Sequence, residues 1–338
     1  MTKINTRSNQ PCVSFIIPLY NCLALTQVML KSLRASLPAG LAHEIIFVDD
    51  GSTDGTRTWL ATLDSPPFRV ILNERNLGYA AANNRGAALA RSRFLVLLNS
   101  DLALTPHWLE PMLDLHARFG TRAGLIGNVQ RDARTGAIDH SGIFINAKGK
   151  PQHDRTAYPF SNYRKAVAVT GACLLVERAL WTELGGFDEN FVNGCEDVDL
   201  CLRARAAGRI NAVALRSVVG HHVSASPGRK LRDEENTRRL TLRWRKELAQ
   251  AGLVAWCRNH ISRGLNAARA DLGLIEAAAV LACAFGLRKR PPLAAIRGME
   301  ASIDLELERW RALLGPVSLT PRFESPLAPP TADAGSPQ

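Results

Sequence analysis

FLVLLNSDLALTP, residues 94–106, contains an apolar run that stops at three polar residues, Asn99, Ser100 and Asp101. An uninterrupted run of large apolar side chains is typical of a short strand that is buried on both faces. Asn, Ser and Asp can all form a turn by bonding to their own backbone, so a turn explains the end of the strand. A ligand-binding site at the end of the strand is the alternative, and the surrounding sequence bears on this choice.

The first hundred residues alternate between short apolar runs and helical stretches. Strands are expected at residues 13–17, 45–48, 70–72 and 94–98, and helices at residues 23–37, 56–63 and 80–91. This alternation predicts an α/β fold, with a mostly parallel sheet flanked by helices on both faces. Ligands bind such sheets beyond the carboxyl ends of the strands.

Polar residues follow each of these four apolar runs. They are PLYN at 18–21, DDGS at 49–52, NERNLG at 73–78 and NSD at 99–101. Each group taken alone is explained by a turn or a helix cap. Because the carboxyl ends of parallel strands meet at one edge of a sheet, the four groups together predict a binding site there.

The rest of the chain continues the α/β pattern and then changes in composition. Strands are expected at 123–129 and 210–219, hairpins up to Gly149, an apolar run at 166–176, and helices at 106–119, 178–184 and 196–207. From residue 224 the chain becomes basic and helical to about residue 314, and the Pro-rich end is expected to be disordered. We therefore expect an α/β domain at 1–223, a basic loop with C-terminal helices at 224–315, and a tail at 316–338.

Charge and cysteine content narrow the class of protein. The 42 Lys and Arg against 31 Asp and Glu give a net charge of +11, so nucleic acid, an anionic membrane and phosphorylated substrates are all open as partners. The seven cysteines include no CxxC pair and are expected to be reduced thiols. The N-terminus lacks the apolar core of a signal peptide, which favours a cytoplasmic location.

One apolar segment could contact a membrane. Residues 272–287 are apolar apart from Glu276, and Arg288, Lys289 and Arg290 follow directly. The segment is shorter than the roughly twenty residues that span a bilayer. Ordinary helix packing is one interpretation, and docking on an anionic membrane surface is the other.

Six stretches occur in an order that resembles the family 2 glycosyltransferases. They are VSFIIPLYN (13–21), IIFVDDGSTDGT (45–56), NLGYAAANNRG (76–86), FLVLLNSD (94–101), TGACLLVERALWTELGGFDENF (170–191) and EDVDLCLRARAAGR (196–209). The motif LLNSD, and the motif GGFDE followed by EDVDL, are similar to those of the bacterial rhamnosyltransferase-like branch. The resemblance covers about residues 13–245. It implies the GT-A fold and an inverting sugar transfer from a nucleotide-diphosphate donor, such as dTDP-rhamnose, to a bacterial surface glycan or lipid-linked acceptor.

The resemblance also implies where the donor binds. The residues expected to contact the nucleotide sugar are Pro18, Tyr20, Asn21, Asp50, Asn76, Gly78, Asn83 and Asn99. Asp50 is expected to accept a hydrogen bond from the pyrimidine N–H, and Gly78 lets the backbone approach the ligand closely. Asp49 is expected to be structural or to lie near the ribose.

Glu196 and Asp197 match the ED pair of the family. By this resemblance Asp197 is the general base, which takes the proton of the acceptor hydroxyl as that oxygen attacks the anomeric carbon. Gly171 and Glu196 are expected on the acceptor side. The alternative is that these acids only complement the dipole at the start of a helix. Asp199 lies four residues before Arg203 and is expected to be structural.

Asp101 and His221 are the expected ligands of a divalent cation, Mn²⁺ or Mg²⁺. The alternative to His221 is His222, one residue further on. Most enzymes of this architecture have a second Asp where this chain has Asn99, so only Asp101 brings negative charge to the cation. We therefore expect weak cation affinity without the donor and tighter affinity with it.

The basic residues after position 224 also have a role by this resemblance. Arg229, Lys230 and Arg238 are expected to close over the diphosphate, where fixed cations stabilise developing charge. Nucleic-acid binding would instead require aromatic side chains among the basic residues, and only Trp244 lies there. Nucleic acid is therefore not an expected partner.

Two other functions compete with sugar transfer. A dinucleotide-binding oxidoreductase would carry GxGxxG after the first strand, and the sequence has none there. A non-catalytic glycan- or nucleic-acid-binding protein on a transferase scaffold fits the positive charge. Retention of Asp50, Asp101 and Asp197 favours the enzyme.

Overall fold

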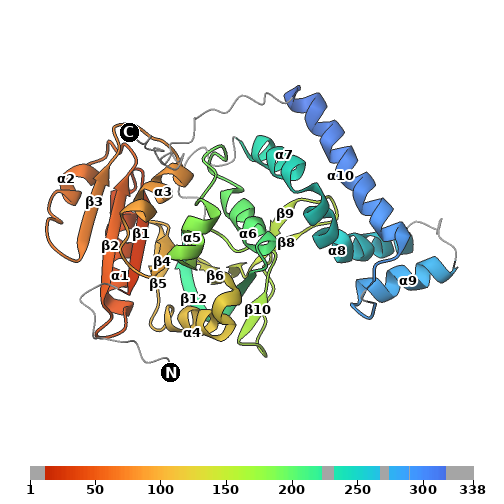
Figure 1. The fold of residues 1–338 in the computed structure, drawn as a ribbon, viewed down its shortest axis with the longest axis horizontal. Coiled ribbons are helices and arrows are strands. Elements are labelled where there is room, and N and C mark those ends of the chain that lie inside the picture. Colours follow the sequence, from red (N-terminus) through yellow and green to blue (C-terminus); the bar gives the residue numbers. More distant parts are fainter. Residues whose placement is uncertain (1–11, 223–231, 267–273, 289, 317–338) are drawn as a thin grey trace, which may run out of the picture.

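The structure is a computed structural model that describes residues 12–222, 232–266, 274–288 and 290–316 (Figure 1). Arg229 and Lys230 of the basic loop, and nearly all of the tail expected at 316–338, lie outside the described residues.

The first hundred residues form the predicted parallel half of the sheet. Its strands are β1 (Val13–Leu19), β2 (His43–Asp49), β3 (Phe68–Leu72) and β4 (Phe94–Leu98), and its helices are α1 (Leu23–Ser36), α2 (Thr56–Leu60) and α3 (Tyr79–Leu89). The spatial order is β4-β1-β2-β3, with all three pairings parallel. The carboxyl ends of these strands therefore lie at one edge, as the sequence predicts.

β1 extends two residues beyond its predicted end and includes Pro18, which has no N–H to donate. The pairing of β1 with β4 ends where Ile16 lies opposite Leu97, while the pairing with β2 continues to Leu19. Pro18 is therefore tolerated in a central strand because one side of the ladder has already ended.

The second half of the sheet is mixed. It contains β5 (Leu102–Leu104), β6 (Ala123–Asp132), β7 (Ile138–His140), β10 (Tyr163–Lys165), β11 (Cys173–Glu177) and β12 (Ile210–His221). The full order is β10-β12-β6-β11-β4-β1-β2-β3, and β5 and β7 pair with β12 and β6 respectively. β8 (Ile143–Ile145) and β9 (Pro151–His153) form a separate hairpin. The whole is a mixed, mostly parallel central sheet flanked by helices.

Several sequence-based boundaries differ from the structure by a few residues. The helix expected at 106–119 is α4 (Glu110–Phe119), which a 3₁₀ turn, Gly120–Arg122, follows. Residues 106–109 form turns and bends, and the short strand β5, which pairs with β12, precedes them. In the apolar run 166–176 only the part from Cys173 is a strand, and its backbone before Gly171 makes an isolated bridge between Ala168 and Ile143.

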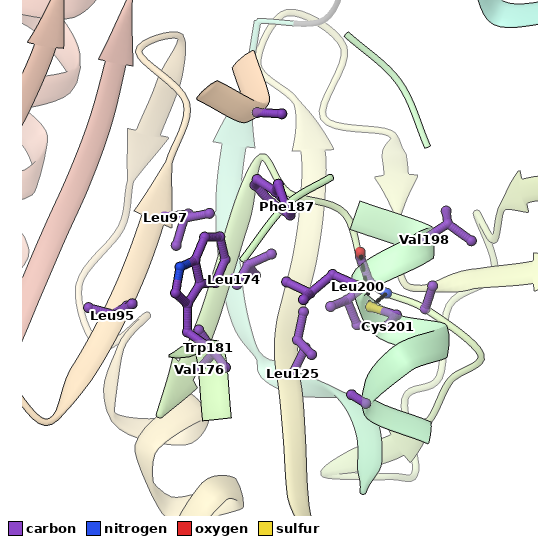
Figure 2. Packing of buried hydrophobic residues seen from close by; sticks show 14 of the residues in the cluster. Leu95, Leu97, Leu125, Leu174, Val176, Trp181, Phe187, Val198, Leu200 and Cys201 are labelled. Atoms are coloured by element: carbon purple, nitrogen blue, oxygen red, sulfur yellow. Dashed lines mark hydrogen bonds between the residues drawn. The ribbon is translucent and has the colours of Figure 1, made fainter. Parts of the chain in front are cut away.

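Helices cover both faces of the sheet because strand side chains alternate between faces. Ile16 and Ile46 pack with α3, α5 (Arg178–Leu184) and α6 (Glu196–Ala206), whereas Phe15 and Ile45 pack with α1 and α4. In the first core, Trp181 of α5 lies beside Leu97 of β4 (Figure 2). Its ring meets that of Phe187 edge to face, with the centroids 4.9 Å apart.

Four helices follow the sheet in the described part of the chain, and two of them, α8 and α10, contact the β8–β9 hairpin (Figure 1). They are α7 (Asp233–Arg243), α8 (Arg245–Asn266), α9 (Leu274–Ala284) and α10 (Leu293–Leu314). A Cβ added at Gly149 of the hairpin turn would lie 2.6 Å from Ile303 of α10, so the hairpin and the helix are in close contact. Among the described residues, no helix combines the length with the apolar character needed to cross a bilayer.

We expect Trp181→Ala to lower the free energy of unfolding by about 3–5 kcal/mol, because it leaves a cavity between the sheet and α5. The measurement is urea denaturation followed by circular dichroism. Phe160→Ala is the control: this side chain is 99% exposed, so its removal should change stability by less than about 0.5 kcal/mol. Equal losses in the two variants would contradict this account of the core.

Candidate functional site

Asp50, at the carboxyl end of β2, holds the loop that follows β3. Its buried carboxylate accepts hydrogen bonds from the side-chain amide of Asn73 and from the backbone N–H groups of Leu77 and Gly78, at 2.8–2.9 Å. Gly78 has φ 96°, a conformation that favours glycine, and it precedes the first residue of α3. Asp50 therefore has three donors from the protein itself, and a nucleotide base would be a fourth.

Asp49 has a structural environment. It is fully buried, and Arg57 donates to it from Nε at 2.8 Å. Arg57 also donates to the Asn73 carbonyl, so this pair connects α2 to the ends of β2 and β3. This agrees with the structural alternative for Asp49.

The loops after β1 and β2 are bound to each other. The Asn21 backbone N–H donates to Ser52 Oγ, and the Thr53 N–H donates to the Asn21 side chain, both at 2.8 Å. Asn21 has φ 57°, which turns the chain sharply after Tyr20. The Tyr20 side chain is exposed beside this turn, where a planar ligand can reach its ring.

The other donor-side residues differ in accessibility. Asn76 is exposed, whereas Asn83 is buried in α3 and its amide donates to the Tyr79 carbonyl at 2.9 Å. The side-chain oxygens of Asn83 and Asn99 are buried and have no hydrogen-bond partner among the described residues. Buried polar atoms are rarely left without a partner, so these two oxygens are available to a ligand or to water.

Asp101 and His221 lie together, as the sequence predicts. Asp101 Oδ1 is 3.5 Å from His221 Nε2, and both side chains are buried. Strand pairing produces this contact, because His221 lies opposite Leu102 and the His222 N–H donates to the Asp101 carbonyl. The His222 side chain is exposed, so the geometry favours His221 over His222 as a ligand.

These two residues fit one side of a cation site. Asp101 Oδ1 and both ring nitrogens of His221 lack hydrogen-bond partners among the described residues, and a carboxylate with an imidazole suits Mn²⁺. No group of three or more His, Cys, Asp or Glu able to hold a metal occurs within the described part of the chain. A bound cation would therefore need further ligands from the donor.

Asp197 lies in the first turn of α6 and faces Gly171, which precedes the start of β11. Its Oδ2 accepts a hydrogen bond from the Gly171 N–H, and its Oδ1 accepts one from the Val198 N–H, both at 2.8 Å. A Cβ added at Gly171 would lie 3.0 Å from Tyr79 Oη, which donates to the Gly171 carbonyl at 2.8 Å. Glu196 is buried beside Asp197 and accepts a hydrogen bond from the Gly194 N–H at 2.6 Å.

Asp199 is structural, as predicted from its spacing. It is fully buried and ion-paired with Arg203 Nε at 2.8 Å. Its other oxygen accepts a hydrogen bond from Trp244 Nε1 at 2.8 Å and lies 3.2 Å from Arg243. Trp244, the one aromatic residue of the basic stretch, thus connects the helical extension to α6.

Comparison with known protein families assigns this chain to one of them. The sequence profile described as Glycosyl transferase family 2 matches residues 14–183, which is half of the chain. The chain belongs to glycosyl transferase family 2. The family predicted from the six stretches is thereby confirmed.

Bacterial relatives of this family 2 chain cover much of its α/β part. The uncharacterized protein y4gI of Sinorhizobium fredii is 31% identical over 70% of this chain and 27% of its own length. The O-antigen biosynthesis protein RfbC of Myxococcus xanthus is 28% identical over 64% of this chain and 18% of its own. The N-acetylglucosaminyl-diphospho-decaprenol L-rhamnosyltransferase of Mycobacterium tuberculosis is 29% identical over 55% of this chain and 68% of its own. The chain thus spans about a quarter and about a fifth of the first two relatives.

Solved structures confirm the GT-A fold. GalNAc-T7 with UDP, GalNAc and Mn²⁺ has a TM-score of 0.58 at 17% identity, covering 71% of this chain and 50% of that one. The mannosyltransferase PcManGT of Pyrobaculum calidifontis, with GDP-Man and Mn²⁺, has a TM-score of 0.53 at 19% identity, covering 90% and 88%. The described C-terminal helices complete the predicted architecture.

Sequence reasoning missed three contributors to the site of this family 2 protein. Tyr79 supports Gly171, and Asn193 accepts a hydrogen bond from the Tyr79 N–H at 3.2 Å. Asn73 joins Asp50 to the loop before α3. The available signal was position, since Asn73 begins the predicted NERNLG stretch and Tyr79 follows it directly. Arg238 was expected near the diphosphate, but it donates to the Gly315 carbonyl at the end of α10.

We expect Asp199→Ala to lower the free energy of unfolding by about 3 kcal/mol, because it leaves half-buried Arg203 without its carboxylate partner and Trp244 Nε1 without its acceptor. Glu183→Gln is the control, since it breaks a more exposed pair with Arg209 that should contribute less than about 1 kcal/mol. Thermal and urea unfolding measure both changes. Unaltered stability of the Asp199 variant would show that its ion pairs are not structural.

Proposed function

We propose that this family 2 protein is an inverting glycosyltransferase that moves a sugar from a nucleotide-diphosphate donor to a hydroxyl group of an acceptor. The observation that carries the proposal is a pair of buried groups at the carboxyl edge of the sheet, Asp101 Oδ1 and His221 Nε2, which have no hydrogen-bond partner within the described parts of the chain. A catalytic edge explains why these atoms are left available to a ligand.

The donor lies across the ends of β1 to β4 in this proposal. Exposed Tyr20 and Asn76 contact the base and ribose, with Pro18, Asn21 and Gly78 shaping the backbone around them. Asp50 positions the Gly78 loop and presents its carboxylate to the pyrimidine N–H. Asn83 and Asn99 supply neutral acceptor oxygens.

Asp101 and His221 would hold the divalent cation, Mn²⁺ or Mg²⁺, together with the diphosphate of the donor. The cation would neutralise the charge of the departing nucleotide diphosphate. Asp101 brings one carboxylate charge, while His221 contributes a neutral nitrogen. The presence of Mn²⁺ in the two similar structures supports this proposal.

Asp197 is the proposed base. It is half-buried at the start of α6, and each of its oxygens accepts one backbone hydrogen bond, which fixes its orientation while leaving lone pairs free. It removes the proton of the acceptor hydroxyl as this oxygen attacks the anomeric carbon from the face opposite the leaving group, and the configuration inverts. Gly171 and Glu196 line the acceptor side.

The sugar is proposed to be rhamnose, and the acceptor a bacterial surface glycan or a lipid-linked sugar. The relatives named as an L-rhamnosyltransferase and as proteins of O-antigen and succinoglycan biosynthesis support this choice. Asn99 adds support, because the motif LLNSD that contains it resembles the rhamnosyltransferase-like branch.

We expect Asp197→Asn to slow transfer by about 100-fold to 10,000-fold, because the amide cannot accept the hydroxyl proton. Donor affinity should stay unchanged, since the amide oxygen can still accept the Gly171 hydrogen bond, while loss of the bond from the Val198 N–H should lower stability by only about 1 kcal/mol. The assay is a panel of nucleotide sugars with Mn²⁺ or Mg²⁺, with Asp304→Asn on the surface of α10 as the control.

Two results would contradict the proposal that this protein is a glycosyltransferase. One is a chain that binds and turns over no donor in the panel. The other is an Asp197→Asn variant that restores glycan synthesis as well as the wild type does. Glycan binding without turnover would favour the non-catalytic alternative.

The helical extension is proposed to contact an anionic membrane from the cytoplasmic side. α9 packs through Val280, Cys283 and Ala284, leaving Ile275, Phe285 and Leu287 90%, 71% and 83% exposed. Arg288 and Arg290 are exposed next to these apolar side chains. Apolar side chains beside cations match the interface of a bilayer that contains anionic lipids.

We expect the double variant Phe285→Glu with Leu287→Glu to bind phosphatidylglycerol vesicles at least about 10-fold more weakly, because two apolar contacts are lost. Sedimentation with vesicles measures the bound fraction, and Phe160→Glu, an equally exposed substitution away from α9, is the control. Equal binding by the double variant and the wild type would end the membrane proposal.

A further inference from the structure

The His221 ring lies between two carboxylates. Its Nε2 is 3.5 Å from Asp101 Oδ1, and its Nδ1 is 3.6 Å from Asp139 Oδ2. The ring is only 3% exposed, and neither nitrogen has a hydrogen-bond partner among the described residues. The second carboxylate, Asp139, belongs to none of the six stretches that resemble the family.

Asp139 is held in place from both sides. It lies in β7, which pairs with β6, while β12 with His221 pairs with the same strand. The Asp139 side chain is 11% exposed, and Arg155 donates to its Oδ1 from a distance of 3.2 Å. The remaining oxygen, Oδ2, is the one that faces His221.

The two carboxylates differ in what they need from the ring. A neutral imidazole has one N–H and one nitrogen lone pair, and the tautomer decides which nitrogen carries each. With the proton on Nδ1, the ring donates toward Asp139 and presents the Nε2 lone pair on the side of Asp101. Without a cation, either tautomer directs one lone pair at a carboxylate, but a cation held between Nε2 and Asp101 would remove that repulsion for the Nδ1–H tautomer alone. Metal-binding histidines commonly use their second nitrogen in the first way.

We propose that Asp139 is a positioning residue, whose carboxylate holds His221 in the Nδ1–H tautomer with the Nε2 lone pair facing Asp101. The inference rests on the proposed cation site, because that site gives the orientation its purpose. Asp139 itself touches neither the donor nor the cation. Its effect passes through the His221 ring.

The test measures the tautomer directly. Long-range ¹⁵N–¹H spectra of ¹⁵N-histidine-labelled protein at pH 8, with UDP and diamagnetic Mg²⁺, separate the two tautomers, and the spectrum of His221→Gln identifies the signals of His221. We expect the Nδ1–H form in the wild type. In Asp139→Ala that preference should be lost, and Asp139→Asn serves as a second variant if the alanine variant does not fold.

Cation binding is the second measurement. Titration of Mn²⁺ in the presence of dTDP or UDP should give about 10-fold to 100-fold weaker affinity for the Asp139 variants than for the wild type. Asp64→Asn removes an exposed carboxylate before β3 and should leave both the tautomer and the affinity unchanged.

The outcomes separate this inference from the proposed function. An unchanged His221 tautomer in the Asp139 variants, or a doubly protonated ring in the wild type, would overturn the positioning role. A lost tautomer preference with unchanged Mn²⁺ affinity would support the positioning role and reject His221 as a cation ligand. No Mn²⁺ binding by the wild type would reject the proposed cation site and, with it, the inference that rests on that site.

Discussion

The pairing of β12 on both sides is the constraint on which the site depends. Its last residues, Val219–His221, pair with β5 on one side and with Gln130 to Asp132 of β6 on the other. Because strand side chains alternate, a shift of one residue would turn His221 to the opposite face of the sheet and bring its neighbour to Asp101. The two ladders prevent that shift, so backbone hydrogen bonds select which histidine meets the carboxylate.

The buried carboxylate of Asp199 likewise fixes the position of α6, the helix that carries Asp197. Asp199 binds Arg203 within α6, and it also binds Arg243 and Trp244 at the junction of α7 and α8. Removal of Asp199 would take the carboxylate partner from Arg203 and the hydrogen-bond acceptor from Trp244, so the network stabilises the contact between these elements. The start of α6, which carries Asp197, is thereby fastened to the helical extension. The extension is part of the support of the site as well as its proposed membrane contact.

Strands within long apolar runs could be predicted from the sequence, because a strand that is buried on both faces consists almost entirely of apolar residues. β4 occupies the predicted residues, and the polar residues after β1 to β4 lie at one edge as expected. β5 was missed because three residues are too few to show a period, and its pairing partner lies more than a hundred residues later. Asp139 was missed for a related reason: its spacing from His221 follows no local motif, and only the shared pairing with β6 brings the two side chains together.

By itself the sequence determined the order of strands and helices, the family, and the types of chemical group available at the edge of the sheet. These depend on local periodicity and on motifs within short stretches, which are written in neighbouring residues. Only the tertiary structure decided that His221 rather than His222 is buried beside Asp101. It also decided that the carboxylate of Asp50 accepts hydrogen bonds from the loop that contains Gly78, and that Asp139 faces the His221 ring. Those contacts join segments far apart in the chain, so they exist only after the strands have paired and the helices have packed.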